Sequence, residues 1–82
     1  MSTLAQTVDH MADSKTPIQA MWVIPHDVSV EQTVYECMIH LLTVNPFIEF
    51  KLLDRGLYFP ASNSIIVFGH LHEMHLPQMM KN

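Results

Sequence analysis

The sequence predicts a small α+β domain in which a single sheet packs on one main amphipathic helix. Three observations predict this class. The chain has 82 residues, which suits one core and is short for two domains. An apolar stripe of helical period runs through residues 29–44, and runs rich in β-branched and aromatic residues flank it. We therefore expect one domain over residues 1–82, with 1–16 and 70–82 as candidate flexible termini.

The first expected element is a short helix within residues 3–12, with Ser2 as its candidate N-cap. Apolar residues recur there at helical spacing, namely Leu4, Val8, Met11 and Ala12. A linker follows over residues 14–17. The run Ile18–Ile24 is rich in β-branched and aromatic residues and stops at Pro25, which predicts a central or half-buried strand.

The main helix is expected over residues 29–44. Ser29 and Gln32 have the spacing of a capping box at its start. Pro46 restricts Asn45, so the helix should end there. The apolar residues that should share its buried side are Val30, Val34, Cys37, Met38, Leu41 and Leu42.

Three strands in a meander should complete the sheet, giving a β-α-β-β-β order. Residues 47–53 alternate in polarity, which predicts a strand with one buried face formed by Ile48, Phe50 and Leu52. Gly56 can supply the positive φ of a tight hairpin before a short strand at 57–59. The unbroken apolar run at 64–68 predicts a strand that is buried on both faces or has a covered edge.

A second architecture rests on the segment Trp-Val-Ile-Pro-His-Asp-Val-Ser-Val-Glu-Gln, which occupies residues 22–32. This segment resembles the strand-to-helix entry of ubiquitin-like β-grasp domains. The resemblance implies that residues 3–9 form a strand paired with 18–24. Helix and strand therefore remain alternatives for the N-terminal segment.

Charge and composition exclude several function classes. The net charge is −4, and the four basic residues, Lys15, Lys51, Arg55 and Lys81, are scattered, so we expect no nucleic-acid binding. The single cysteine, Cys37, cannot form an intramolecular disulfide, which fits a reducing compartment. No apolar run approaches the roughly 20 residues that span a bilayer, and the N-terminal residues do not form a secretory signal. We therefore expect a cytoplasmic protein without membrane contact.

Histidines are concentrated near the C-terminus, in Gly69-His70-Leu-His72-Glu73-Met-His75. In an extended segment His70 and His72 point the same way, and Glu73 or His75 can complete a zinc shell after a turn. A zinc-binding protein that uses His70, His72 and His75 is therefore the alternative function. The favoured hypothesis requires no cofactor.

Residues 65–72, Ile-Ile-Val-Phe-Gly-His-Leu-His, resemble the terminal Gly-His-x-His motif of calcineurin-like metallophosphoesterases. The Asp-x-His, Gly-Asp and Gly-Asn-His motifs of that family are absent from the chain, so we do not expect its activity.

Cys37 lies in the apolar stripe, which predicts a buried and inert thiol. Ser62 and Ser64 lack a glycine-flanked elbow, and there is no phosphate-cradling loop. We expect that the protein is not an enzyme.

The remaining hypothesis concerns surfaces. The large adaptable side chains that suit an interface are Tyr58, Phe59, Met74, Met79 and Met80. Tyr58 and Phe59 must point to opposite faces of their strand, so one of them needs cover from outside the core. We expect a small protein-binding module, either an inhibitor or accessory protein of viral or mobile-element origin or a homodimer. A sheet edge at 18–24 or 57–59 can pair with another strand.

Overall fold

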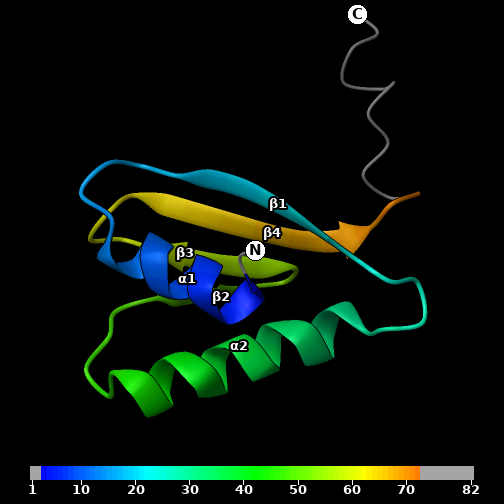
Figure 1. Ribbon diagram of the computed structural model, residues 1–82, viewed down its shortest axis with the longest axis horizontal. Coiled ribbons are helices and arrows are strands. Elements are labelled where there is room, and N and C mark those ends of the chain that lie inside the picture. Colours follow the sequence, from blue (N-terminus) through cyan, green and yellow to red (C-terminus); the bar gives the residue numbers. More distant parts are fainter. Residues whose placement is uncertain (1–2, 73–82) are drawn as a thin grey trace, which may run out of the picture.

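One sheet with two helices on the same face makes up the fold, and a computed structural model describes residues 3–72 of it (Figure 1). The elements in chain order are α1 (Leu4–Asp13), β1 (Gln19–Ile24), α2 (Val30–Val44), β2 (Lys51–Leu53), β3 (Gly56–Phe59) and β4 (Ser64–His70). The expected small α+β domain is confirmed. No helix in this part of the chain is long and apolar enough to cross a membrane.

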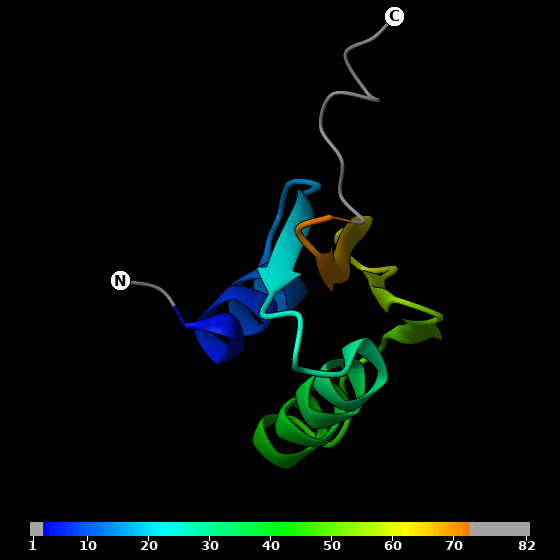
Figure 2. The same ribbon diagram turned by 90° about the vertical axis from the view of Figure 1, so that its right-hand side faces the viewer.

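The four strands lie in the order β1-β4-β3-β2. β1 runs parallel to β4, whereas β4 with β3 and β3 with β2 are antiparallel. α2 carries the chain from β1 at one edge to β2 at the other (Figure 1). A view turned by 90° shows α1 and α2 on the same side of the sheet (Figure 2). Over residues 3–72, no helix covers the opposite face.

The N-terminal segment is helical because a complete capping box starts it. The N-cap is Thr3, one residue after the expected Ser2. Its Oγ1 accepts a hydrogen bond from the Gln6 N–H at 3.1 Å, and the Gln6 side chain accepts one from the Thr3 N–H at 2.9 Å. Residues 3–9 therefore do not form the strand that the ubiquitin-like alternative requires.

α2 follows the sequence prediction closely. Ser29 is its N-cap, and the Ser29 Oγ accepts from the Gln32 N–H at 3.2 Å. Gln32 does not complete a capping box, because its side-chain amide donates to Glu36 at 3.0 Å. Asn45 ends the helix, as the following Pro46 predicts.

The core lies between the helices and the inner face of the sheet. Phe59 and Phe68 are its largest members and are at most 1% exposed. The other buried apolar residues are Val8, Met11, Ile24, Val30, Val34, Cys37, Leu41, Leu57 and Ile66. They come from five of the six elements, so the core forms only when both helices and the long strands have assembled.

Two of the strands predicted for the second half of the chain have different bounds in the structure. The strand expected over 47–53 is limited to β2, since a turn in which the Ile48 N–H donates to the Asn45 carbonyl follows α2. Ile48 and Phe50 still pack on the core, but Leu52 is 54% exposed because β2 is an edge strand. The run from 64 extends as β4 to His70, so Gly69 and His70 belong to the sheet.

Gly56 is required for a different reason from the one expected. Its φ is not positive, and the left-handed residue is Asn63 (φ 55°) in the next turn. A Cβ on Gly56 would lie 2.0 Å from the Ile66 carbonyl oxygen. The glycine therefore permits close approach of β3 to β4 rather than an unusual turn.

Two buried hydroxyls connect α1, β1 and β4. The Ile18 N–H donates to the Ser64 Oγ at 2.9 Å, the Ser64 and Ser62 hydroxyls are 2.8 Å apart, and the Ser62 hydroxyl lies 2.9 Å from the Met11 carbonyl oxygen that it donates to. Both serines are at most 6% exposed. These three hydrogen bonds connect the end of α1 and the start of β1 to the turn before β4.

Candidate interaction surface

Within residues 3–72 no helix covers one face of the sheet, and this face is largely apolar. Side chains of register partners point to the same face, so the pairings Met21 with Val67, Tyr58 with Ile65 and Lys51 with Tyr58 define it. We call this the outer face. Its members are Gln19, Met21 and Val23 from β1, Ile65 and Val67 from β4, Tyr58 from β3, and Lys51 and Leu53 from β2. Met21 is 52% and Val23 50% exposed, which is high for apolar side chains in a sheet.

β1 also has an open backbone edge. It pairs with β4 on one side and is the last strand of the sheet on the other. The Ile18 carbonyl accepts from the Ile65 N–H at 2.9 Å, so residue 18 points its backbone groups toward β4. Backbone groups of successive strand residues point to alternate sides. Those of Gln19, Met21 and Val23 therefore point away from β4, to the open edge.

The two edges of the sheet differ in how they resist pairing. β2 is three residues long, contains Lys51, and is followed by Asp54 and Arg55. Short length and charge are the usual protections of an edge strand. β1 is six residues long and contains neither a charge nor a proline. It is the unprotected edge. Its exposed residues alternate with less exposed ones, as expected for the half-buried strand that the sequence predicted.

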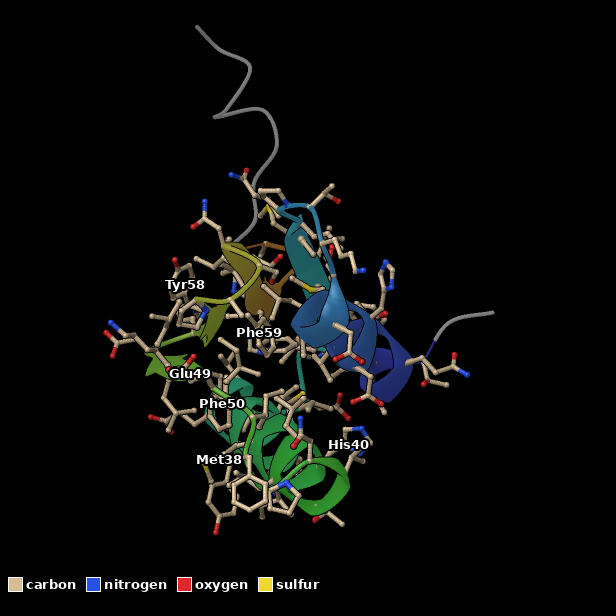
Figure 3. The ribbon with its side chains drawn as sticks, turned by 90° about the vertical axis from the view of Figure 1, so that its left-hand side faces the viewer. Met38, His40, Glu49, Phe50, Tyr58 and Phe59 are labelled. Carbon is tan, nitrogen blue, oxygen red and sulfur yellow. The ribbon has the colours of Figure 1, made fainter. Side chains whose placement is uncertain are left out.

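The residues predicted for the interface fall in three places. Phe59 is 1% exposed and points between the sheet and the helices, so it belongs to the core and not to a surface (Figure 3). Tyr58 is half-buried on the outer face, and its hydroxyl donates to Asn63 at 2.9 Å. Met74, Met79 and Met80 lie outside the described residues. The proposed edge at 57–59 was wrong, because β3 lies between β4 and β2.

α2 presents a second apolar surface that the sequence did not reveal. Tyr35, Ile39 and Leu42 follow one another at helical spacing and are 57%, 45% and 41% exposed. Leu42 was expected on the buried side, where the structure places Thr33 instead. Because α2 is apolar around much of its circumference, its sequence periodicity did not separate the two sides.

The histidine cluster is partly assembled. The rings of His70 and His72 are parallel, with centroids 5.8 Å apart. The His70 Nε2–H donates to the Val28 carbonyl at 2.8 Å, so in the neutral ring Nδ1 carries the lone pair. His75 lies outside the described residues. Within residues 3–72 there is no group of three metal-ligating side chains.

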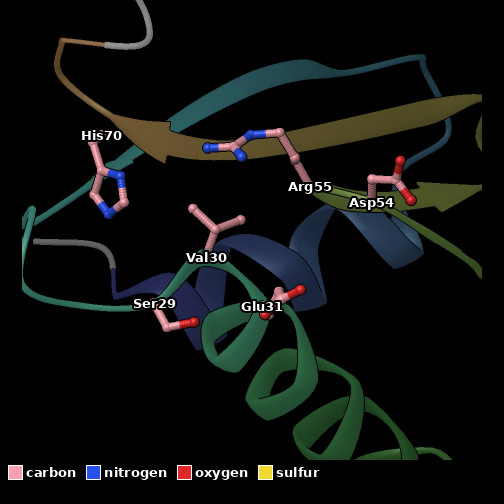
Figure 4. Close-up of a pocket in the computed structure, with 6 residues that line it drawn as sticks. All are labelled: Ser29, Val30, Glu31, Asp54, Arg55 and His70. Atoms are coloured by element: carbon pink, nitrogen blue, oxygen red, sulfur yellow. The ribbon is translucent and has the colours of Figure 1, made fainter.

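A cleft of about 510 Å³ opens beside the first turn of α2 (Figure 4). Its lining residues are Ser29, Val30, Glu31, Asp54, Arg55 and His70. The lining carries the carboxylates of Glu31 and Asp54 together with the guanidinium of Arg55, so charges of both signs share this space. The Ser29 hydroxyl oxygen already accepts from the helix backbone. The cleft holds no activated nucleophile.

Cys37 is buried, as expected. Its side chain lines a small groove between α1 and α2, and the residue is 5% exposed. Burial raises the pKa of the Cys37 thiol from 9.0 to about 11, with a further contribution from the charge of Glu36. On the same side of α2, the Nε2 of His40 lies 3.0 Å from both carboxylate oxygens of Asp9 on α1. This pair connects the two helices.

Comparison of the chain with known protein families, curated proteins and solved structures found no match. Over residues 3–72, the arrangement best suited to recognition is the open edge of β1 next to the outer face. The edge offers hydrogen-bond donors and acceptors in a row, and the face offers apolar side chains. Together they can bind an extended polypeptide.

Proposed function

We propose that the protein is a small protein-binding module that receives an extended segment of another polypeptide at the open edge of β1. One observation carries the proposal, namely an uncharged six-residue edge strand in which the side chains of Met21 and Val23 are about half exposed. In this mode of recognition the main-chain hydrogen bonds supply affinity, and contacts with alternate side chains supply specificity.

The chemistry of β1 suits this mode. Each of Gln19, Met21 and Val23 offers one N–H and one C=O to an added strand, and a net contribution of about 1 kcal/mol per hydrogen bond is typical. Side chains of the added strand would pack beside Met21 and Val23 and remove them from water. An inhibitor or accessory role requires no more than this, since holding one segment of a partner needs no catalytic group.

Two matched variants test the proposal. Val23→Lys places a charge on the β1 edge, where it opposes pairing. Ile39→Lys makes the same kind of change on α2 at a similar exposure, 45% against 50%. The tagged full chain and both variants are used to capture proteins from a lysate of the source cells, and self-association is followed by light scattering.

Wild type and Ile39→Lys should retain the same bound protein, or the same dimer, and Val23→Lys should lose at least tenfold of it. Binding that survives Val23→Lys and is lost in Ile39→Lys would assign recognition to α2 and contradict the proposal. Circular dichroism of each variant establishes that the fold is retained.

Zinc binding is a second candidate, and the parallel rings of His70 and His72 favour it. The hydrogen bond from His70 to Val28 is of the kind that orients metal-bound imidazoles. The untagged protein should then retain near-stoichiometric zinc, and His70→Ala with His72→Ala should remove it. Protein that holds no zinc and gains no thermal stability from added zinc would exclude this function.

A further inference from the structure

We propose that the segment received by β1 is β1 of a second copy of this chain, paired antiparallel about a two-fold axis through Met21. This inference rests on the proposed function and names its partner. The pairing would join two four-stranded sheets into one. It would also close both open edges at once, so assembly would stop at a dimer.

The prolines that frame β1 select this register. Pro17 and Pro25 are equidistant from Met21 in the sequence. Proline has no N–H to donate, so a register that placed either one opposite a hydrogen-bonding position would lose a bond. With the axis at Met21, Pro17 faces the partner's Pro25 at both ends of the ladder, and every residue between them keeps its N–H.

The adjacent registers place the axis at Ala20 or at Trp22, and they are worse. With the axis at Ala20, Pro17 lies opposite the partner's Val23, and with the axis at Trp22, Pro25 lies opposite the partner's Gln19. In either case an outward-pointing carbonyl of β1 loses its donor at each end of the ladder. The Met21 register retains the donors and acceptors of Gln19, Met21 and Val23 in each copy, which makes about six hydrogen bonds across the dimer.

Charge supports the same register. Lys15 and Asp27 flank β1 and are both exposed. With the axis at Met21, Lys15 lies opposite Asp27 of the second copy, so the dimer would bring two pairs of opposite charges together. Between these flanks β1 has no charged residue, so two copies with a net charge of −4 each bring no like charges together along the strand.

The side chains are also compatible. On the outer face Met21 meets the partner's Met21, and Gln19 meets the partner's Val23. On the helix side Ala20 lies opposite the partner's Trp22, so a small side chain faces a large one in each of the two equivalent pairs. Met21 and Val23 lose much of their present exposure of about half.

Disulfide cross-linking tests the register directly. In an antiparallel pair, directly opposed and hydrogen-bonded residues have Cα atoms about 5.5 Å apart, within the range that a disulfide spans. Met21→Cys should therefore form a covalent dimer under mild oxidation. Val23→Cys is the matched control, because it has the same strand face and similar exposure, but the two copies of residue 23 are about 13 Å apart along the strands. The wild-type protein shows how much cross-linking comes from its own cysteine, Cys37, which is buried.

Wild type should scatter light at twice the chain mass of 9.4 kDa, and Met21→Cys should cross-link at least tenfold faster than Val23→Cys. Equal cross-linking of the two variants, or a wild type that remains monomeric at all concentrations, overturns the self-pairing. A monomer whose capture of another protein is lost in Val23→Lys overturns this inference and retains the proposed function. A dimer broken by Ile39→Lys alone overturns both.

Discussion

Removal of the Ser64 hydroxyl should destabilise the domain out of proportion to the size of the group. In Ser64→Ala the Ile18 N–H loses its acceptor at 2.9 Å, and the Ser62 hydroxyl loses its neighbour at 2.8 Å. Ser64 is 0% exposed, so water cannot replace the hydrogen bonds that the substitution removes. An unsatisfied buried donor costs about 1–3 kcal/mol, and we expect about 2 kcal/mol here.

Ser62→Ala should cost less, about 1 kcal/mol, because the Met11 carbonyl still accepts from the Ser14 N–H. The double variant should cost about 1 kcal/mol less than the sum, since the two single changes break the same Ser62–Ser64 contact. Urea unfolding at one fixed protein concentration, followed by circular dichroism, measures all three. Costs that simply add, within about 0.3 kcal/mol, would show that the hydroxyls do not act together.

Three further variants or conditions test other parts of the fold. Gly56→Ala should lower the free energy of unfolding by about 3 kcal/mol or prevent folding, because its Cβ would collide with the Ile66 carbonyl oxygen and β3 cannot move away without breaking its hydrogen bonds to β4. Thermal unfolding measures this, and an unchanged melting temperature would contradict it. Cys37 should react slowly with iodoacetamide at pH 8 in the folded protein and quickly in urea, and equal rates would refute its burial. The free energy of unfolding should also fall as pH rises from about 9 toward 11, since the unfolded thiol ionises before the folded one. Asp9→Ala should cost less than about 1 kcal/mol by urea unfolding, because its contact with His40 is partly exposed, and a larger loss would mean that the pair is the main link between the helices.

Local signals in the sequence located the elements well. Ser29 and Pro46 mark the limits of α2 because a cap and a proline act within a turn of their own position. Tyr58 and Phe59 divide between the two faces of β3, as strand alternation requires. Cys37 is buried because its helical phase places it on the inner side. Each of these depends on neighbours in the chain.

The features that were missed depend on distant parts of the chain. Of the two edges proposed from the sequence, only β1 is an edge, because β4 returns parallel to it after α2, β2 and β3, and no local pattern encodes that order. The bond between Ile18 and Ser64 joins segments 46 residues apart in the same way. Leu42 was misplaced because α2 carries apolar residues on both sides. The open edge of β1 could therefore be proposed as one of two edges from the sequence, but only the strand order selects it.

Amide hydrogen exchange along β1 tests the central claim most directly. The Trp22 N–H points to β4 and should be protected at every protein concentration, whereas those of Met21 and Val23 point to the open edge. If this edge binds a second copy, Met21 and Val23 should become protected at least tenfold as the protein concentration rises through the dimerisation range. Rapid exchange at both residues, unchanged by concentration or by addition of a captured partner, would contradict the account.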